Sequence, residues 1–170
     1  MSDYKIPFIR NSFIRFWNDH EEELLGAVKR CGRAGDLILR QDVVDFEKNL
    51  AEYTGTKYAV SCGSGTDALV LACKALGIGP GDEVLVPAHT FIASIYAIKA
   101  NGATPVLIDV GQDELMDVSQ LEGLITPRTK AIMPVHFHGK MVNMTEVMRI
   151  AEKYNLYVIE DAAQALGSRQ

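Results

Sequence analysis

From residue 57 to residue 161, short apolar runs alternate with longer helix-like stretches. Such alternation is typical of βαβ units, in which parallel strands form a sheet that helices cover on both faces. We therefore predict an α/β fold with a mainly parallel sheet and helices on both faces. The expected strands are residues 57–62, 83–86, 105–110, 130–135 and 156–160, and the expected helices are residues 66–76, 92–100, 118–125 and 144–154.

The first 40 residues do not follow this alternation. Residues 13–30 have the pattern of an amphipathic helix, which we expect Gly32 and Gly35 to end. Residues 42–53 have apolar side chains at surface-helix spacing. A chain of 170 residues can bury one substantial core. We predict an N-terminal helical segment over residues 1–40 and a domain that begins at residue 41.

Composition and charge exclude several classes of protein. The net charge of −5 provides no electrostatic reason to expect nucleic-acid binding. No apolar run approaches the ~20 residues that a membrane helix needs. The first residues lack the basic and then apolar pattern of a signal peptide, so we expect a cytoplasmic protein. Three cysteines, an odd number without C-x-x-C spacing, argue against a disulfide framework.

The turn Gly63-Ser64-Gly65-Thr66 joins an expected strand to a helix that is apolar nearly all round, and which we expect to be buried. Free N–H groups and the dipole at the start of a helix attract anions, usually phosphate. Glycine lets the backbone approach closely, and Ser64 and Thr66 add hydroxyl donors. The alternative is an ordinary helix cap formed by Thr66 or Asp67.

The same turn matches G-x-G-x-x-A, the relaxed fingerprint of dinucleotide-binding proteins. That fingerprint requires an acidic residue at the end of the next strand. Here the next strand ends Leu85-Val86-Pro87, without an acid. A dinucleotide site is therefore the weaker interpretation.

Asp161 follows a largely apolar run, at the point where a parallel strand leaves the sheet. A carboxylate in that position needs a partner, because burying it alone is costly. A protonated pyridine nitrogen is a suitable partner, since the charge pair makes the ring an electron sink. Gln164, three residues later, could hydrogen-bond a nearby ring substituent. The alternative is that Asp161 caps a short helix.

Two aromatic features lie near other strand ends. Phe91 could lie flat on a planar cofactor, or it could fill the core at the start of a helix. His136 and His138 place two imidazoles near one strand end. Metal binding would need a third ligand, and none is close in sequence, so we expect no metal site.

These residues together resemble the sugar aminotransferases of the DegT/DnrJ/EryC1/StrS family, which are fold-type I, aspartate aminotransferase-like enzymes that use pyridoxal 5'-phosphate. The resemblance begins near residue 6 and runs to Gln170, with its segments in family order. The matching stretches are residues 54–60, 63–69, 75–84, 90–94, 125–132, 134–136 and 158–164. It implies that residues 41–170 are the first part of the large cofactor-binding domain, without the rest of that domain or the small C-terminal domain.

The family pattern implies a role for each candidate site residue. Gly65 and Thr66 would hold the cofactor phosphate, with Ser64 beside them. Phe91 would stack on the pyridine ring, Asp161 would pair with the ring nitrogen, and Gln164 would lie near the ring hydroxyl. The Schiff-base lysine of the family is expected beyond Gln170, and we interpret Lys140 as a surface lysine. Family active sites also take residues from a second subunit, so a homodimer is implied for the full-length form.

The resemblance implies transfer of an amino group, typically from glutamate, to a nucleotide-linked keto-sugar used for polysaccharides or antibiotics. One alternative is a dehydratase of the same family, in which histidine replaces the lysine. Another is a non-catalytic fragment or a regulatory protein that keeps the fold. Because the lysine is expected outside these 170 residues, we predict that this polypeptide alone has no transaminase activity.

Overall fold

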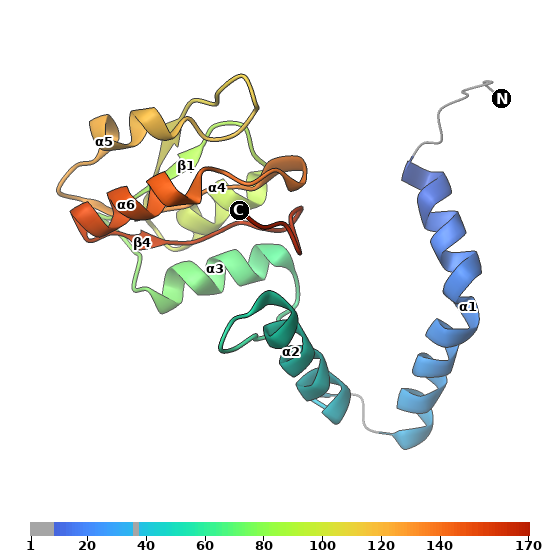
Figure 1. The fold of residues 1–170 in the computed structure, drawn as a ribbon. Helices are drawn as coiled ribbons and strands as arrows, with labels where there is room; N and C mark the ends of the chain where they lie inside the picture. The colour runs from blue at the N-terminus through green and yellow to red at the C-terminus, as the bar shows by residue number, and fades with distance from the viewer. Residues whose placement is uncertain (1–8, 36–37) are drawn as a thin grey trace. The chain divides into compact units, whose positions relative to one another are not determined.

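The computed structural model describes residues 9–35 and 38–170 of the chain (Figure 1). The chain divides into two compact units, residues 1–46 and residues 47–170. Helix α1 spans Ile9–Ala34, and helix α2, Gln41–Thr54, begins in the first unit and ends in the second. No helix in the described residues is both long and apolar enough to cross a membrane.

Helix α1 is longer than its sequence pattern predicts. We expected Gly32 to help end it, but the helix continues through Gly32 to Ala34, and Gly35 follows with a φ of 68°. A glycine inside a helix costs only about 1 kcal/mol relative to alanine, so helix-forming neighbours can carry the helix through it. Gly35 is the residue whose left-handed backbone ends the helix.

The second unit is built on a four-stranded sheet in the order β2-β1-β3-β4, with every neighbouring pair parallel. In the register, Leu85 of β1 lies between Val106 of β2 and Ile132 of β3. This architecture confirms the predicted α/β fold. The strands are β1 Glu83–Pro87, β2 Thr104–Ile108, β3 Thr129–Ile132 and β4 Tyr157–Val158.

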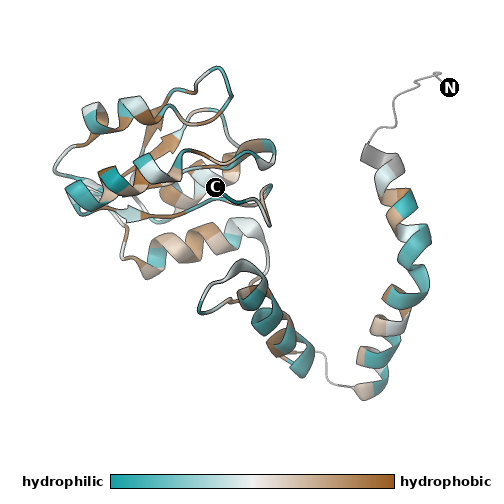
Figure 2. Ribbon diagram, viewed as in Figure 1, coloured by the Kyte–Doolittle hydropathy of each residue, from teal (hydrophilic) through white to brown (hydrophobic). Residues whose placement is uncertain are grey.

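Helices cover both faces of the sheet and form two separate cores (Figure 1). Val84 and Val86 of β1 pack with helices α3 and α4, whereas Leu85 packs in the core with α5 and α6. This alternation follows from the two-residue period of a strand. Figure 2 shows hydrophobic residues along the strands and α4, and hydrophilic ones on α6. The helices are α3 Gly65–Ala75, α4 Ile92–Ala100, α5 Leu121–Leu124 and α6 Met144–Tyr154, with short 3₁₀ helices η1 Val118–Gln120 and η2 Phe137–Gly139.

Two sequence predictions about this unit are wrong. Residues 57–62 form no strand in the structure; instead the Ser61 N–H and hydroxyl both donate to the Glu47 carboxylate. Helix α3 is not buried all round, because only Leu69 and Cys73 are buried and Leu71 is 53% exposed. Apolar composition predicts an element's tendency to be buried, but burial depends on which surfaces are available to cover it.

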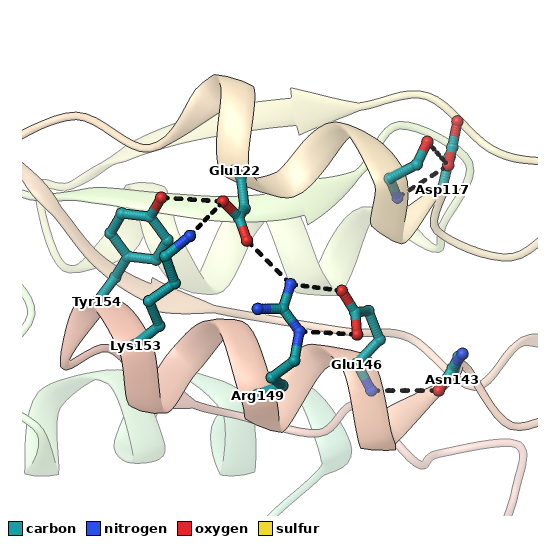
Figure 3. A network of polar contacts seen from close by, with 8 residues as sticks. Asp117, Glu122, Asn143, Glu146, Arg149, Lys153 and Tyr154 are labelled. Atoms are coloured by element: carbon teal, nitrogen blue, oxygen red, sulfur yellow. Dashed lines mark hydrogen bonds and ion pairs between the residues drawn. The ribbon is translucent and has the colours of Figure 1, made fainter.

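A polar network joins α5 to α6 on the surface of the second unit (Figure 3). The Glu122 carboxylate accepts hydrogen bonds from Lys153 at 2.7 Å, Arg149 at 2.9 Å and the Tyr154 hydroxyl at 3.0 Å. Arg149 also pairs with Glu146 on its own helix. Hydrogen bonds from Lys153, Arg149 and Tyr154 lower the pKa of Glu122 from 4.5 to about 2.

Candidate functional site

A cavity of about 230 Å³ lies where the sheet strands end and the following loops begin. This is the edge at which ligands bind in open α/β sheets. Its lining includes five of the six residues that the sequence singled out for a cofactor: Gly65, Thr66, Phe91, Asp161 and Gln164. The sixth, Ser64, is not among the lining residues.

Ser64 is instead the N-cap of α3, the helix that opens at the cavity. Its hydroxyl oxygen accepts a hydrogen bond from the Asp67 N–H at 3.1 Å, and its hydroxyl donates to the Asp67 carboxylate at 2.9 Å. The alternative in which Thr66 or Asp67 caps the helix is therefore wrong. Because the Ser64 hydroxyl is engaged within the turn, the helix start presents backbone rather than the Ser64 side chain to the cavity.

The two glycines of this turn differ in the space around them. A Cβ atom at Gly63 would lie 2.8 Å from the Asp67 carboxylate, so a side chain there would disturb the cap. A Cβ atom at Gly65 would meet no atom within 4 Å, although the residue lines the cavity. Within the described residues, the N–H groups of Gly65 and Thr66 have no hydrogen-bond partner. These two donors at a helix start suit an anion.

Asp161 is held at the cavity by a parallel bridge to Val135. Its N–H donates to the Pro134 carbonyl at 2.9 Å, and its own carbonyl accepts from the His136 N–H at 3.0 Å. The Asp161 side chain is 8% exposed. Its Oδ2 atom accepts from the Ser94 hydroxyl at 2.7 Å, and its Oδ1 atom accepts from the Ala163 N–H at 3.3 Å.

No ion pair among the described residues involves Asp161. A turn rather than a helix follows it, so the proposed alternative, a capping role for a short helix, is wrong. A buried carboxylate without a cation is costly, and the cavity beside it is the place where a positive group would offset that cost.

Phe91 and Gln164 complete the predicted set. Phe91 precedes α4 as its N-cap residue and is 67% exposed, so the alternative that it fills the core is wrong. Its ring is therefore available to a planar ligand. The Gln164 Oε1 atom accepts from the His138 N–H at 2.8 Å. With its oxygen held in this way, Gln164 presents its amide NH₂ as a donor.

The two histidines do not converge on one site. His136 is 1% exposed and lines the cavity, whereas His138 is exposed and packs its ring against Phe137 at 4.2 Å. The His136 Nδ1 atom accepts from the Val142 N–H at 3.2 Å, so its proton is on Nε2, which donates to Glu160 at 2.9 Å. The described residues contain no cluster of three metal-binding side chains.

Sequence reasoning assigned no role to Ser94, which contacts the Asp161 carboxylate directly. One signal was present. Ser94 lies among apolar residues at the start of α4, and it is fully buried. A buried hydroxyl requires a hydrogen-bond partner, but sequence spacing does not name a partner that lies 67 residues away.

The fold agrees with comparisons to known proteins. The sequence profile of the DegT/DnrJ/EryC1/StrS aminotransferase family matches residues 18–170. The chain belongs to this family. Members named as enzymes include the GDP-perosamine synthase of Caulobacter vibrioides, 53% identical over 127 residues that cover 74% of this chain and 34% of that protein. The dTDP-3-amino-3,4,6-trideoxy-alpha-D-glucose transaminase of Streptomyces venezuelae is 41% identical over 166 residues, covering 97% of this chain and 43% of the relative.

Solved structures of family members share the fold. DesV of S. venezuelae, in complex with a ketimine intermediate, superposes with a TM-score of 0.88 at 42% identity, over 90% of this chain and 42% of DesV. NtdA of Bacillus subtilis, with bound cofactor PMP, superposes with a TM-score of 0.86 at 39% identity, over 88% of this chain and 35% of NtdA. The chain spans less than half the length of these relatives.

Proposed function

We propose that the chain contributes the first part of the cofactor site in an aminotransferase that uses pyridoxal 5'-phosphate and converts a nucleotide-linked keto-sugar, with glutamate as amino donor. The names of the relatives support this class of substrate. One observation carries the proposal: Asp161 is a buried carboxylate that lines a cavity without a cationic partner in the described residues. A protonated pyridine is the positive group that such a site fits.

The cavity residues fit the chemical groups of pyridoxal phosphate. The N–H groups of Gly65 and Thr66, at the start of α3, would take the phosphate. The exposed ring of Phe91 would lie against the pyridine. The Gln164 NH₂ group would donate to the oxygen substituent of the ring, because the Gln164 oxygen is already engaged by His138. Ser64, as the helix cap, would support this arrangement without direct contact.

When bound, pyridoxal phosphate supplies an aldehyde that can carry an amino group and a ring that can accept an electron pair. The Asp161 carboxylate would hold the proton on the ring nitrogen, which keeps that ring electron-poor. Phe91 would limit the access of water to one face of the ring. The homodimer, the cytoplasmic location and the assignment of residues 41–170 to the large domain stay predictions.

No lysine lines the cavity in the described residues. We infer that the polypeptide of residues 1–170 holds the cofactor weakly and does not transfer amino groups by itself, because a covalent amine and proton carrier is needed for that step. Transamination is proposed for the full-length protein.

A regulatory role is the second candidate. The "Pleiotropic regulatory protein" of Geobacillus stearothermophilus is 40% identical over 148 residues, which cover 86% of this chain and 40% of that protein. A protein of this kind could retain the cavity without catalysing amino transfer.

Two half-reactions distinguish these candidates. Full-length protein loaded with pyridoxal phosphate is mixed with glutamate, and the absorption of the cofactor is followed together with 2-oxoglutarate release. Addition of a nucleotide-linked keto-sugar should then restore the original spectrum and yield the amino sugar. Cofactor binding without either conversion would overturn the transaminase proposal and favour the regulatory role.

A further inference from the structure

Ser94 connects helix α4 to the strand end that carries Asp161. It is fully buried, and its hydroxyl donates to the Asp161 Oδ2 atom at 2.7 Å. The same Ser94 oxygen lies 2.9 Å from the Thr90 hydroxyl oxygen, and Thr90 lines the cavity. Three side chains from two loops and a helix therefore form one hydrogen-bonded chain at the cavity wall.

The number of available protons fixes which group donates in each of these hydrogen bonds. An ionised carboxylate only accepts hydrogen bonds, so the single Ser94 proton is used on Asp161. The Phe91 carbonyl, 3.4 Å from the Ser94 oxygen, is a more distant acceptor. Thr90 must then donate its proton to Ser94, which leaves the Thr90 oxygen facing its surroundings as an acceptor.

The two oxygens of Asp161 differ in how firmly they are held. Oδ2 has the short bond from Ser94, and Oδ1 has only the bond from the Ala163 N–H at 3.3 Å. A hydrogen bond that fixes one oxygen of a carboxylate also fixes the orientation of the group, and with it the position of the other oxygen. Each oxygen accepts one hydrogen bond and can accept another, and Oδ1 is the one whose present bond is the longer, so it is the more available to a further donor.

We propose that Ser94 is a positioning residue that fixes the Asp161 carboxylate so that Oδ1 meets the ring nitrogen of pyridoxal phosphate, with Thr90 orienting Ser94. This inference rests on the proposed function, since it assumes that the cofactor occupies the cavity. It assigns to α4 a second task besides packing, because α4 delivers the hydroxyl that orients Asp161.

The test uses full-length protein and pyridoxal phosphate labelled with ¹⁵N in the ring. Four variants are compared: Ser94→Ala removes the donor, Ser94→Thr retains a hydroxyl, Thr90→Val removes the second hydroxyl, and Thr129→Val is the control. Thr129 is also buried and hydrogen-bonded, to the Thr126 N–H at 2.9 Å, but it begins β3 at the opposite end of the sheet. The readouts are the dissociation constant, the ¹⁵N shift of the ring nitrogen and the melting temperature without cofactor.

Ser94→Ala should weaken cofactor binding about tenfold, as expected for the loss of one charge-assisted hydrogen bond. It should also move the ¹⁵N shift toward that of an unprotonated ring. Thr90→Val should have a smaller effect in the same direction, and Ser94→Thr should restore binding to within about threefold of the original. Thr129→Val should change only the melting temperature.

A double-mutant cycle keeps the test decisive if a variant is unstable. In an Asp161→Asn background, Ser94→Ala should no longer alter the ¹⁵N shift, because the charged acceptor is gone. Unchanged binding and shift in Ser94→Ala, with a lower melting temperature only, would show that Ser94 merely stabilises the fold. If the original protein fails to bind pyridoxal phosphate or binds it with an unprotonated ring, the proposed function itself is overturned.

Discussion

Thr66, at the start of α3, and Asp161, after β4, line the same cavity although 94 residues separate them in the chain. The first offers an N–H at a helix start that has no partner among the described residues, and the second offers a buried carboxylate. A ligand that spans them needs an anionic group at one end and a protonated nitrogen at the other. That requirement is what makes the pair specific, because neither residue alone would indicate a cofactor.

Asp161→Asn should reduce turnover of the full-length protein far more than it reduces stability. The asparagine keeps the shape and the Ser94 contact but loses the charge that holds the ring proton. The expected loss is on the order of 2–3 kcal/mol in the barrier, measured as single-turnover rates with glutamate.

The matched control for that substitution is Asp45→Asn, on the exposed surface of α2, where the carboxylate accepts from Gln41 at 2.8 Å. It should leave the rate unchanged. Near-normal turnover in Asp161→Asn would show that the carboxylate serves only the local turn.

The polypeptide of residues 1–170 should show no site-specific covalent attachment of pyridoxal phosphate. Reduction with borohydride after incubation with cofactor, followed by mass spectrometry, should find only scattered modification of surface lysines such as Lys140. A stoichiometric adduct at one lysine, together with amino transfer from glutamate, would contradict this expectation.

Ser64→Ala should lower the free energy of unfolding by about 1 kcal/mol, because the Asp67 N–H loses the oxygen that caps α3. Ser64→Gly should cost only a few tenths of a kcal/mol, since glycine is itself tolerated at this position. Urea titrations of the cofactor-free protein would measure both. Equal stability of the serine and alanine forms would mean that the cap contributes nothing measurable.

Glu122→Gln should lower the melting temperature more at neutral pH than in acid. The network in Figure 3 lowers the pKa of Glu122 from 4.5 to about 2, so the folded protein binds the proton less readily than the unfolded chain does. The stabilisation from this group is therefore fully present above pH 4.5 and is lost as the pH falls toward 2. Melting curves of both forms at pH 7 and pH 3 should show the difference shrinking.

Glu152→Gln is the control for the network. Glu152 lies on the same helix, α6, and within the described residues it makes no side-chain hydrogen bond or ion pair. Its replacement should change the melting temperature little at either pH. Added salt should reduce the effect of Glu122→Gln, because the contacts lie at the surface.

The secondary structure was predictable wherever local signals agreed. The bounds of α4 and α6 match the expected helices, because Asn101-Gly102 and Asn155 end them with turn residues. The run at residues 57–62 had the composition of a strand but lies outside the sheet. A strand requires a hydrogen-bonding neighbour as well as a suitable composition, and no local pattern reports whether a neighbour is present.

The amino-acid sequence by itself determined the alternation of strands and helices from β1 onward, and with it the edge of the sheet where Phe91 and Asp161 emerge. Parallel strands place their carboxyl ends together, so this outcome follows from periodicity alone. Only the tertiary structure decided that Ser64 closes the helix turn and that Ser94 holds the Asp161 carboxylate. Those contacts depend on side-chain directions and on packing between distant segments, which spacing along the chain does not encode.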